Sequence, residues 1–438
     1  MSSDSTTDKL LNLDAVKSEI LDLTNCDREP IHIPNSIQPH GILLAFSESD
    51  YQIVQVSLNT KQILGIEPQD LLDRSLEELL GKEQVETIRG CLVEDFDNIN
   101  PLSLTITQDN CSQKLSFEGI VHCNKGVAIL ELEPTQSSSE VDFFDFYRLV
   151  KSPLSKIQST FTLDELCQIV VKQVRQITEF DRVMVYRFDT EGAGTVIAEE
   201  VKEGLEPYLG LHYPATDIPR QAKKLYSLNF LRLIPDVSYE PVGLIPELNP
   251  ITQEPLDLSL SVLRSVSPIH IEYLGNMGVT ASMSISLLKN KKLWGLIACH
   301  HGTPRHIPYQ IRTVCEFIGQ VVSLELAAKE DNQDLDYKMK LKSLQAHFID
   351  TISTAEDLET GLTQKSSLLL ELVSAGGTAL CFREEFTLIG NTPTQAEIEA
   401  LLPWLETQFN DDVIYETTCL SDAYPPAEQY APDRKSVV

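Results

Sequence analysis

Four side chains in the sequence could hold a ligand that carries acidic groups. Arg232 and Arg264 can each bind a carboxylate through two parallel hydrogen bonds, because the guanidinium fork matches the carboxylate in shape. Ser282 and Ser284 lie two residues apart in the apolar run "ASMSISLLKN", so on a strand their hydroxyls would share one face. These residues predict a pocket for a ligand with two acidic arms and a large apolar body.

Other polar side chains lie in stretches that otherwise look like protein core. They are Ser267, His270 and Tyr273 in "LRSVSPIHIEYLGNMGV" and His300 in "LWGLIACHH". A single histidine on an apolar face is more often a satisfied core residue than a ligand, but several such residues in one domain favour a binding site. The run Cys299-His300-His301 resembles a metal patch, but on a strand at most two of the three could face the same side.

Asp217 lies in the stretch "LGLHYPATDIPRQAKKLY". Ile218 precedes a proline and is disfavoured in helical geometry, whereas Pro219 suits a first helical turn. We therefore expect a helix from about Pro219 through Tyr226. Asp217 is then either a simple helix cap or, given its place between a Pro-rich turn and a long loop, a pocket residue.

The surrounding elements divide the chain into α+β units. Residues 41–65 predict a strand, a turn at 47–50, a second strand through Val56 and a helix beginning near Ser57 or Asn59. Strands at 102–106, 115–121 and 126–132 follow, and the polar stretch 133–140 marks a boundary. A larger unit has a helix within 163–180 and strands within 182–189, 194–201, 281–290 and 292–301, the last of them central.

Two long segments stand out. Five prolines in residues 229–257 exclude a long helix and a central strand, while interleaved apolar residues favour an ordered, functional loop. Residues 320–360 lack Gly and Pro, so they form either two helices with a break near 331–334 or one helix of roughly 60 Å. A single helix would be a rod that pairs with a second copy. A third unit follows and stops at Val438 without enough strands for a sheet, so we expect it to be incomplete.

Composition limits the partners. The 438 residues suggest two or three domains, and the formal charge of -30 disfavours nucleic acid and anionic membranes. The sequence shows neither a signal peptide nor a spanning run, so a cytoplasmic location is expected. Nine cysteines without a paired cluster suggest neither disulfides nor structural zinc. Phosphate-loop, dinucleotide, zinc-protease and serine-hydrolase motifs are absent from the sequence.

Together these motifs resemble the photosensory part of phytochromes, most closely the bacterial type that binds biliverdin, and a cyanobacterial source is expected. The resemblance spans roughly residues 15–435 and also rests on "NCDREPIHIPNSIQPHG". It implies an N-terminal extension (1–25), a PAS domain with the preceding attachment segment (26–135), a bilin-binding GAF domain (141–325), and a connecting helix with an incomplete PHY domain (326–438). It also implies a figure-of-eight knot, in which the N-terminal segment threads the GAF loop 229–257.

The resemblance implies where the pigment is attached. In bacterial phytochromes a cysteine ahead of the PAS domain, matched here by Cys26, forms a thioether with biliverdin. Plant and many cyanobacterial members instead use a cysteine just before the histidine matched by His270, where this chain has Ile269. Covalent biliverdin at Cys26 is therefore expected, and phycocyanobilin could bind without a covalent bond.

Roles for other residues are also implied by the resemblance. Asp217 would direct its backbone carbonyl at the pyrrole nitrogens and its side chain toward the PHY domain. His270 would hydrogen-bond the pyrrole region, and His300 the carbonyl of ring D, which turns about a double bond in light. The tyrosines around ring D would be Tyr186, Tyr213 and Tyr226; the propionate contacts Arg232, Arg264, Ser282 and Ser284; and the remaining contacts Ile218, Pro219, Ser267, Ile269 and Tyr273.

The implied function is a red/far-red photoreceptor module without turnover of its own. A homodimer through helices and a histidine-kinase output acting on a response regulator are expected. With an incomplete PHY domain, the chain is expected to bind pigment but could lack a stable far-red state. Two alternatives stay open: a light-independent sensor of a cyclic nucleotide or haem, with His270 or Cys26 as haem ligand, and an interaction scaffold whose pocket is empty.

Overall fold

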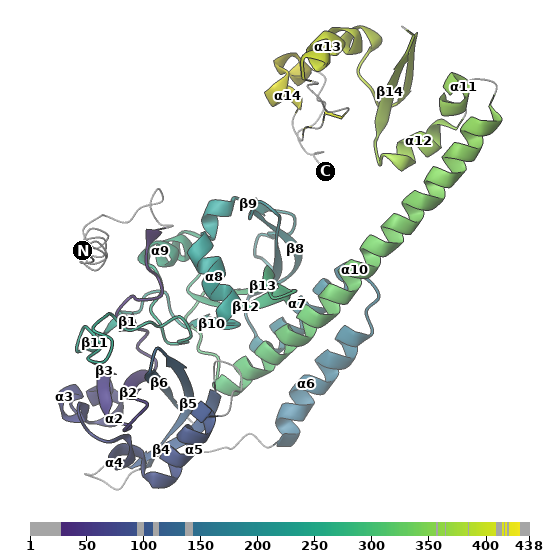
Figure 1. The fold of residues 1–438 in the computed structure, drawn as a ribbon. Helices are drawn as coiled ribbons and strands as arrows, with labels where there is room; N and C mark the ends of the chain where they lie inside the picture. The colour runs from purple at the N-terminus through teal and green to yellow at the C-terminus, as the bar shows by residue number, and fades with distance from the viewer. Residues whose placement is uncertain are drawn as a thin grey trace, which may run out of the picture. The chain divides into compact units, whose positions relative to one another are not determined.

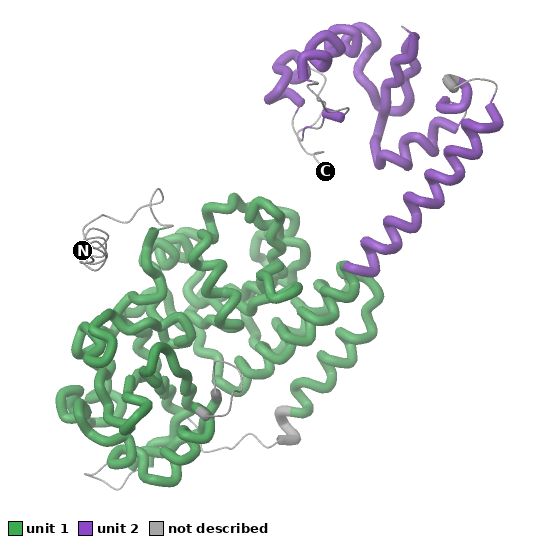
Figure 2. The backbone as a smooth tube through the Cα atoms, viewed as in Figure 1, with its two compact units in different colours: residues 1–330 green, residues 331–438 purple. Residues whose placement is uncertain are grey.

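The computed structural model describes residues 28–93, 100–107, 114–135, 143–355, 358–363, 365–383, 385–408, 414–415, 417 and 420–429. The chain divides into two compact units, residues 1–330 and residues 331–438, drawn in different colours in Figure 2. None of the described helices combines the length and the apolar character needed to cross a bilayer.

The first sheet of unit 1 contains the strands that the sequence predicts before residue 135. They are β2 (Ile42–Ser47), β3 (Ile53–Ser57), β4 (Asn100–Thr107), β5 (Lys114–Asn124) and β6 (Val127–Pro134), with helices α2 (Thr60–Leu64), α3 (Pro68–Leu71), α4 (Leu76–Leu80) and α5 (Lys82–Val93). Asn59 is the residue before α2, as expected. The polar boundary begins later than predicted, because Glu133 lies on β6 and is buried.

Two further strands from outside this region extend the first sheet. They are β1 (Ser36–Ile37) and β11 (Val242–Ile245), and the strand order is β1-β11-β3-β2-β6-β5-β4. The expectation that the Pro-rich loop holds no inner strand is therefore wrong. The four residues of β11 lie between Pro241 and Pro246, so both prolines stay outside the ladder.

The N-terminal segment hydrogen-bonds both to the beginning of the Pro-rich loop and to residues that follow the loop. The Gln38 amide side chain donates to the carbonyl of Leu233 at 3.0 Å, and its backbone N–H donates to the carbonyl of Leu263 at 2.7 Å. The backbone N–H of Ser265 donates to the carbonyl of Ser36 at 3.1 Å. The N-terminal segment thus contacts the chain on either side of the loop, and the figure-of-eight knot stays a prediction.

The second sheet of unit 1 separates two layers of helices (Figure 1). Its order is β10 (Leu231–Ile234), β12 (Ala281–Lys289), β13 (Lys292–His301), β7 (Arg182–Phe188), β8 (Gly194–Val201) and β9 (His212–Tyr213), so β13 is an inner strand, as predicted. One face packs against α6 (Phe143–Gln158), α7 (Leu163–Thr178) and the beginning of α10, which all contribute to one large apolar core. The short helix η2 (Ala215–Asp217), α8 (Arg220–Leu228) and α9 (Pro268–Asn276) lie on the other side.

Helix α10 runs without interruption over Tyr309–Thr354, so the alternative of a break near 331–334 is wrong. It also begins well before the expected Gln320, because Gly319 lies inside the helix. A Cβ atom at Gly319 would lie 2.5 Å from Cγ2 of Ile285 on β12, so the glycine allows α10 to approach the sheet closely.

Unit 2 continues from α10. Its other elements are α11 (Leu358–Thr363), α12 (Ser366–Leu372), β14 (Gly377–Phe382), β15 (Glu385–Gly390), α13 (Gln395–Gln408), α14 (Leu420–Ala423) and η3 (Pro425–Gln429). In the part of this unit that the structure describes, β14 and β15 pair as a two-stranded sheet.

Candidate functional site

The register of the second sheet gathers several predicted site residues on one face. Arg232 pairs with Ser284, and Ser282 pairs with His300. Tyr186 pairs with Leu296, four residues before His300 on β13. Because side chains alternate along a strand, all these residues project from the face opposite the large core. The predicted sharing of a face by the two serines is thus part of a wider polar and aromatic surface.

Tyrosines form the apolar part of this surface. The rings of Tyr186 and Tyr213 lie 5.7 Å apart between centroids, and both belong to an apolar cluster that also includes Tyr226 and Ile218. The structure therefore brings together the three tyrosines that we expect around one end of a pigment. Each ring offers a large flat apolar surface.

Arg232 is a buried cation with an unused hydrogen-bond donor. Its Nε donates to Ser284 Oγ at 2.9 Å, and its Nη1 donates to Ser286 Oγ at 2.7 Å and to the carbonyl of Asn229 at 2.6 Å. Its Nη2 is buried without a hydrogen-bond partner in the described part of the chain. Burial lowers the pKa of Arg232 to about 10. Among the described residues, no carboxylate pairs with this guanidinium as one normally does when the cation is buried, so this position suits an anionic ligand group.

Arg264 and Ser267 connect the same region to the N-terminal segment. Arg264 Nη1 donates to the carbonyl of Ile31 at 2.7 Å, while its Nε is buried with no partner among the described residues. The Ser267 hydroxyl donates to Glu29 Oε2 at 2.6 Å, and burial raises the pKa of Glu29 above its usual value. Cys26, three residues earlier, lies outside the described residues.

Two histidines beside this surface are neutral at neutral pH. Burial, followed by the nearby charge of Arg182 and by His270, lowers the pKa of His300 to about 3. Burial lowers the pKa of His270 to about 4. Nδ1 of His300 is buried and has no hydrogen-bond partner within the described ranges. A neutral imidazole can donate from one ring nitrogen and accept at the other, so His300 could serve either kind of ligand atom.

Asp217 does not cap a helix, because α8 begins at Arg220 after Pro219 and carries no side-chain cap bond. It ends η2 instead, and its Oδ2 accepts a hydrogen bond from the Tyr273 hydroxyl at 3.3 Å. Burial, and then the charge of Asp217, raise the pKa of Tyr273 above its usual value. Of the two alternatives for Asp217, a helix cap or a pocket residue, the helix cap is therefore wrong. Ile269 and His270 are neighbours on α9.

Sequence reasoning missed two residues of this surface. Ser286 accepts from Arg232 and donates from its Oγ to the carbonyl of Tyr226 at 2.6 Å; continuing the two-residue spacing beyond Ser284 would have found it. Arg182 pairs with His300 in the strand ladder, and its guanidinium lies 3.6 Å from the centroid of the Tyr208 ring. That position depends on which strands are neighbours, which the local sequence does not reveal.

The Cys299-His300-His301 run does not act as a unit. Cys299 is fully buried in the large core, His300 projects from the opposite face, and His301 Nδ1 lies 3.1 Å from Oδ2 of Asp181. The alternation that argued against a metal patch is therefore present in the structure.

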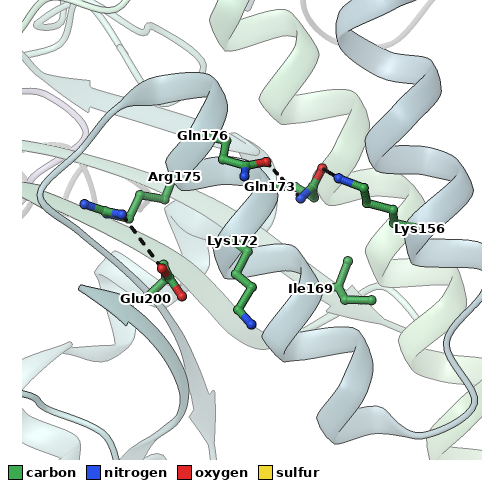
Figure 3. Close-up of a pocket in the computed structure, with 7 residues that line it drawn as sticks. All are labelled: Lys156, Ile169, Lys172, Gln173, Arg175, Gln176 and Glu200. Atoms are coloured by element: carbon green, nitrogen blue, oxygen red, sulfur yellow. Dashed lines mark hydrogen bonds and ion pairs between the residues drawn. The ribbon is translucent and has the colours of Figure 1, made fainter. Parts of the chain in front are cut away.

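A separate surface pocket lies elsewhere in unit 1 (Figure 3). It has a volume of about 370 Å³ and is lined by Lys156, Ile169, Lys172, Gln173, Arg175, Gln176 and Glu200, from α6, α7 and β8. Within this lining, Lys156 donates to Gln173 and Arg175 forms an ion pair with Glu200. It includes none of the predicted site residues.

Comparison with known proteins identifies the family. The chain matches the PAS fold over residues 26–135, the GAF domain over 162–328 and the Phytochrome region over 341–434. It is 44% identical to the phytochrome photosensory core module of Stigmatella aurantiaca, with a TM-score of 0.75, over 94% of this chain and 81% of that one. The chain belongs to the phytochrome family.

Other relatives agree with this phytochrome assignment. A bacteriophytochrome structure from R. palustris is 38% identical with a TM-score of 0.77, covering 93% of this chain and 81% of that one. Cyanobacterial phytochrome B of Nostoc sp. is 50% identical over 93% of this chain and 54% of its own length. The chain spans about half the length of the first curated relatives it matches.

Proposed function

We propose that this phytochrome chain is a red/far-red photoreceptor module. The linear tetrapyrrole would bind on the face of the second sheet that lies opposite the large core, which we call the pigment face. The observation that carries the proposal is the buried guanidinium of Arg232, with one N–H group unused and no carboxylate partner among the described residues. A propionate group would satisfy it, and Arg264 offers a second unpartnered nitrogen. Ser282 and Ser284 are proposed to assist these two arginines.

The residues of the surface also suit the body of such a ligand. Tyr186, Tyr213 and Tyr226 give it an apolar wall that excludes water, and the unpartnered Nδ1 of His300 can hydrogen-bond a carbonyl group. His270 and the Asp217–Tyr273 pair are proposed to contact the pyrrole region, with Ile218 and Pro219 beside them. The chemistry that a bound bilin supplies is rotation about a double bond in light.

Biliverdin joined to Cys26 by a thioether is the proposed pigment, and phycocyanobilin is the alternative without a covalent bond. Position 269, where other members carry the attachment cysteine, is isoleucine in this chain. Glu29 bonds to Ser267 next to α9, and three residues of chain span at most about 10 Å, so a thiol at residue 26 could reach this region.

Incubation of the bilin-free chain with biliverdin tests this function. We expect a red-absorbing adduct whose zinc-induced fluorescence survives denaturation, and we expect Cys26→Ala to take up pigment without the covalent bond. Cys123→Ala, which changes an exposed thiol elsewhere, is the matched control. A chain that stays colourless would refute the function, whereas a covalent adduct in Cys26→Ala would refute only the attachment site.

The wider role is also a proposal. Signalling through a histidine kinase to a response regulator needs segments outside this chain, and a cytoplasmic location would follow from that role. A homodimer through α10 is supported by exposed apolar side chains such as Leu324, which is 75% exposed, and Met339, which is 61% exposed. The domain boundaries at 135/141 and 325/326 remain predictions.

A further inference from the structure

A group of three side chains that includes none of the predicted pigment contacts has the composition of a metal site. His40 lies between β1 and β2, Glu133 is on β6, and His306 lies between β13 and α10. Strand pairing of Ile42 with Leu132 brings the residues just before β2 beside Glu133. Among the described residues, it is the group of three His, Cys, Asp or Glu side chains whose ligand atoms lie close enough together to bind one metal ion.

The distances suit three ligands of one ion. Oε2 of Glu133 lies 3.2 Å from Nε2 of His306 and 3.9 Å from Nε2 of His40, and the ligand atoms of all three residues lie within 4.8 Å of one another. Tetrahedral ligands about 2.0–2.1 Å from zinc are roughly 3.3 Å apart. Small side-chain adjustments would therefore bring all three atoms into a coordination shell.

The hydrogen-bonding state of His40 is a second, independent sign. The His40 side chain is only 14% exposed, so water does not readily reach it. Its Nε2 is buried and nevertheless has no hydrogen-bond partner among the described residues. The 3.9 Å separation from Glu133 is too long for a hydrogen bond. A buried nitrogen that faces a carboxylate without bonding it lacks a partner, and an ion between the two would supply one.

Arg312 orients the carboxylate without blocking it. Its Nη2 donates to Oε1 of Glu133 at 2.6 Å, which leaves Oε2 directed at the two imidazoles. Metal-binding carboxylates in proteins are commonly held by such an outer hydrogen bond. The His306 side chain is 44% exposed, so an ion could enter from solvent and keep a water ligand.

We propose that His40, Glu133 and His306 form a binding site for a divalent transition-metal ion, with zinc the best match to two imidazoles and one carboxylate. The ion would join the turn before β2, the end of β6 and the segment that leads into α10. The competing explanation is an ion pair of Glu133 with Arg312 and His306, in which His40 takes no part.

The two explanations differ in titrations of the whole 438-residue chain, stripped with a chelator, with and without bilin. We expect one equivalent of Zn²⁺ by calorimetry and, with Co²⁺, the visible absorption of a four-coordinate ion with nitrogen and oxygen ligands. His306→Ala should weaken binding at least about 100-fold, since even loss of an outer-shell partner costs about 10–100-fold. His347→Ala, an exposed histidine on α10, should leave it unchanged.

Several results would overturn the site. They are the absence of zinc binding by the intact chain at micromolar concentrations, equal binding by His306→Ala and the unaltered chain, and a cobalt–thiolate charge-transfer band, which would mean that cysteines hold the ion. His40→Gln is the second variant. The metal site predicts weaker zinc binding by this variant, whereas zinc binding equal to that of the unaltered chain would show that His40 takes no part. Bilin uptake by each variant serves as the check that the chain is folded.

Discussion

Replacing Arg232 with methionine should weaken ligand binding while leaving the free energy of unfolding almost unchanged. Burial lowers the pKa of Arg232 from its usual value to about 10. A lowered cationic pKa means that the folded chain holds the charge less favourably than the unfolded chain at every pH below that value. At about 1.4 kcal/mol per pH unit, the shift corresponds to roughly 3 kcal/mol of destabilisation in the bilin-free protein at neutral pH.

The guanidinium also makes hydrogen bonds that methionine would lose. Bonds to Ser284, Ser286 and Asn229 are worth about 1 kcal/mol each, which approximately offsets the cost of the buried charge. The free energy of unfolding of the bilin-free variant should therefore stay within about 1 kcal/mol of the parent. Equilibrium unfolding in denaturant measures this value.

Ligand binding should change far more than stability. A charge-assisted hydrogen bond to a propionate is worth about 2 kcal/mol, or roughly thirtyfold in affinity. The assay is an absorbance titration on a Cys26→Ala background, where binding is reversible, with biliverdin and with its dimethyl ester. The ratio of the two affinities should fall roughly thirtyfold in Arg232→Met.

Arg89→Met is the matched control, because this arginine lies on α5, outside the second sheet and its helices, and pairs with Glu86 of the same helix. Its affinity ratio should equal that of the parent. An unchanged ratio in Arg232→Met would show that no carboxylate of the pigment lies at Arg232, and the assignment of the site to this sheet face would lose its main support.

Three further predictions use independent features. His300 has a pKa of about 3 in the folded chain and about 6.5 in the unfolded chain, so protons bind the unfolded chain preferentially and stability is lost as pH falls below 6.5. Between pH 7 and pH 5, the free energy of unfolding of the bilin-free parent should fall by roughly 2 kcal/mol more than that of His300→Gln, as measured by denaturant unfolding. Gly319→Ala should destabilise by about 1–3 kcal/mol through contact with Ile285, whereas Gly90→Ala, where no atom lies within 4 Å, should stabilise by about 0.5–1 kcal/mol; equal signs in thermal melts would contradict this. Leu324→Glu should convert the proposed dimer to a monomer in light scattering, and a variant that stays dimeric would exclude this part of α10 from the interface.

Local patterns predicted the elements and part of the site. Alternating polarity placed Ser282 and Ser284 on one strand face, and Pro219 marked the beginning of α8, because both effects depend only on neighbouring residues. The same reasoning failed for Glu133. Its buried partner Arg312 comes from another part of the chain, and an acidic residue in a polar stretch looks like a linker until that partner is known.

Two other outcomes depended on tertiary contacts. The stretch without Gly and Pro began at Gln320, yet α10 begins eleven residues earlier, because Gly319 is an interior position where the helix approaches β12 closely. The strand β11 was not predicted, because the prolines on either side of it argue against a strand. The local sequence does not show that its four residues pair on both sides with strands from elsewhere in the chain. Likewise, the neighbour relation of Arg182 and His300 requires the strand order.

The insertion of β11 between β1 and β3 has a consequence for synthesis. Residues 242–245 leave the ribosome long after the strands that flank them, so the first sheet is still unfinished when its own sequence has been translated. Nascent chains usually complete their domains one after another from the amino terminus. The edge of β3 that pairs with β11 therefore stays uncovered while more than a hundred further residues are translated, and an uncovered strand edge can pair with other chains.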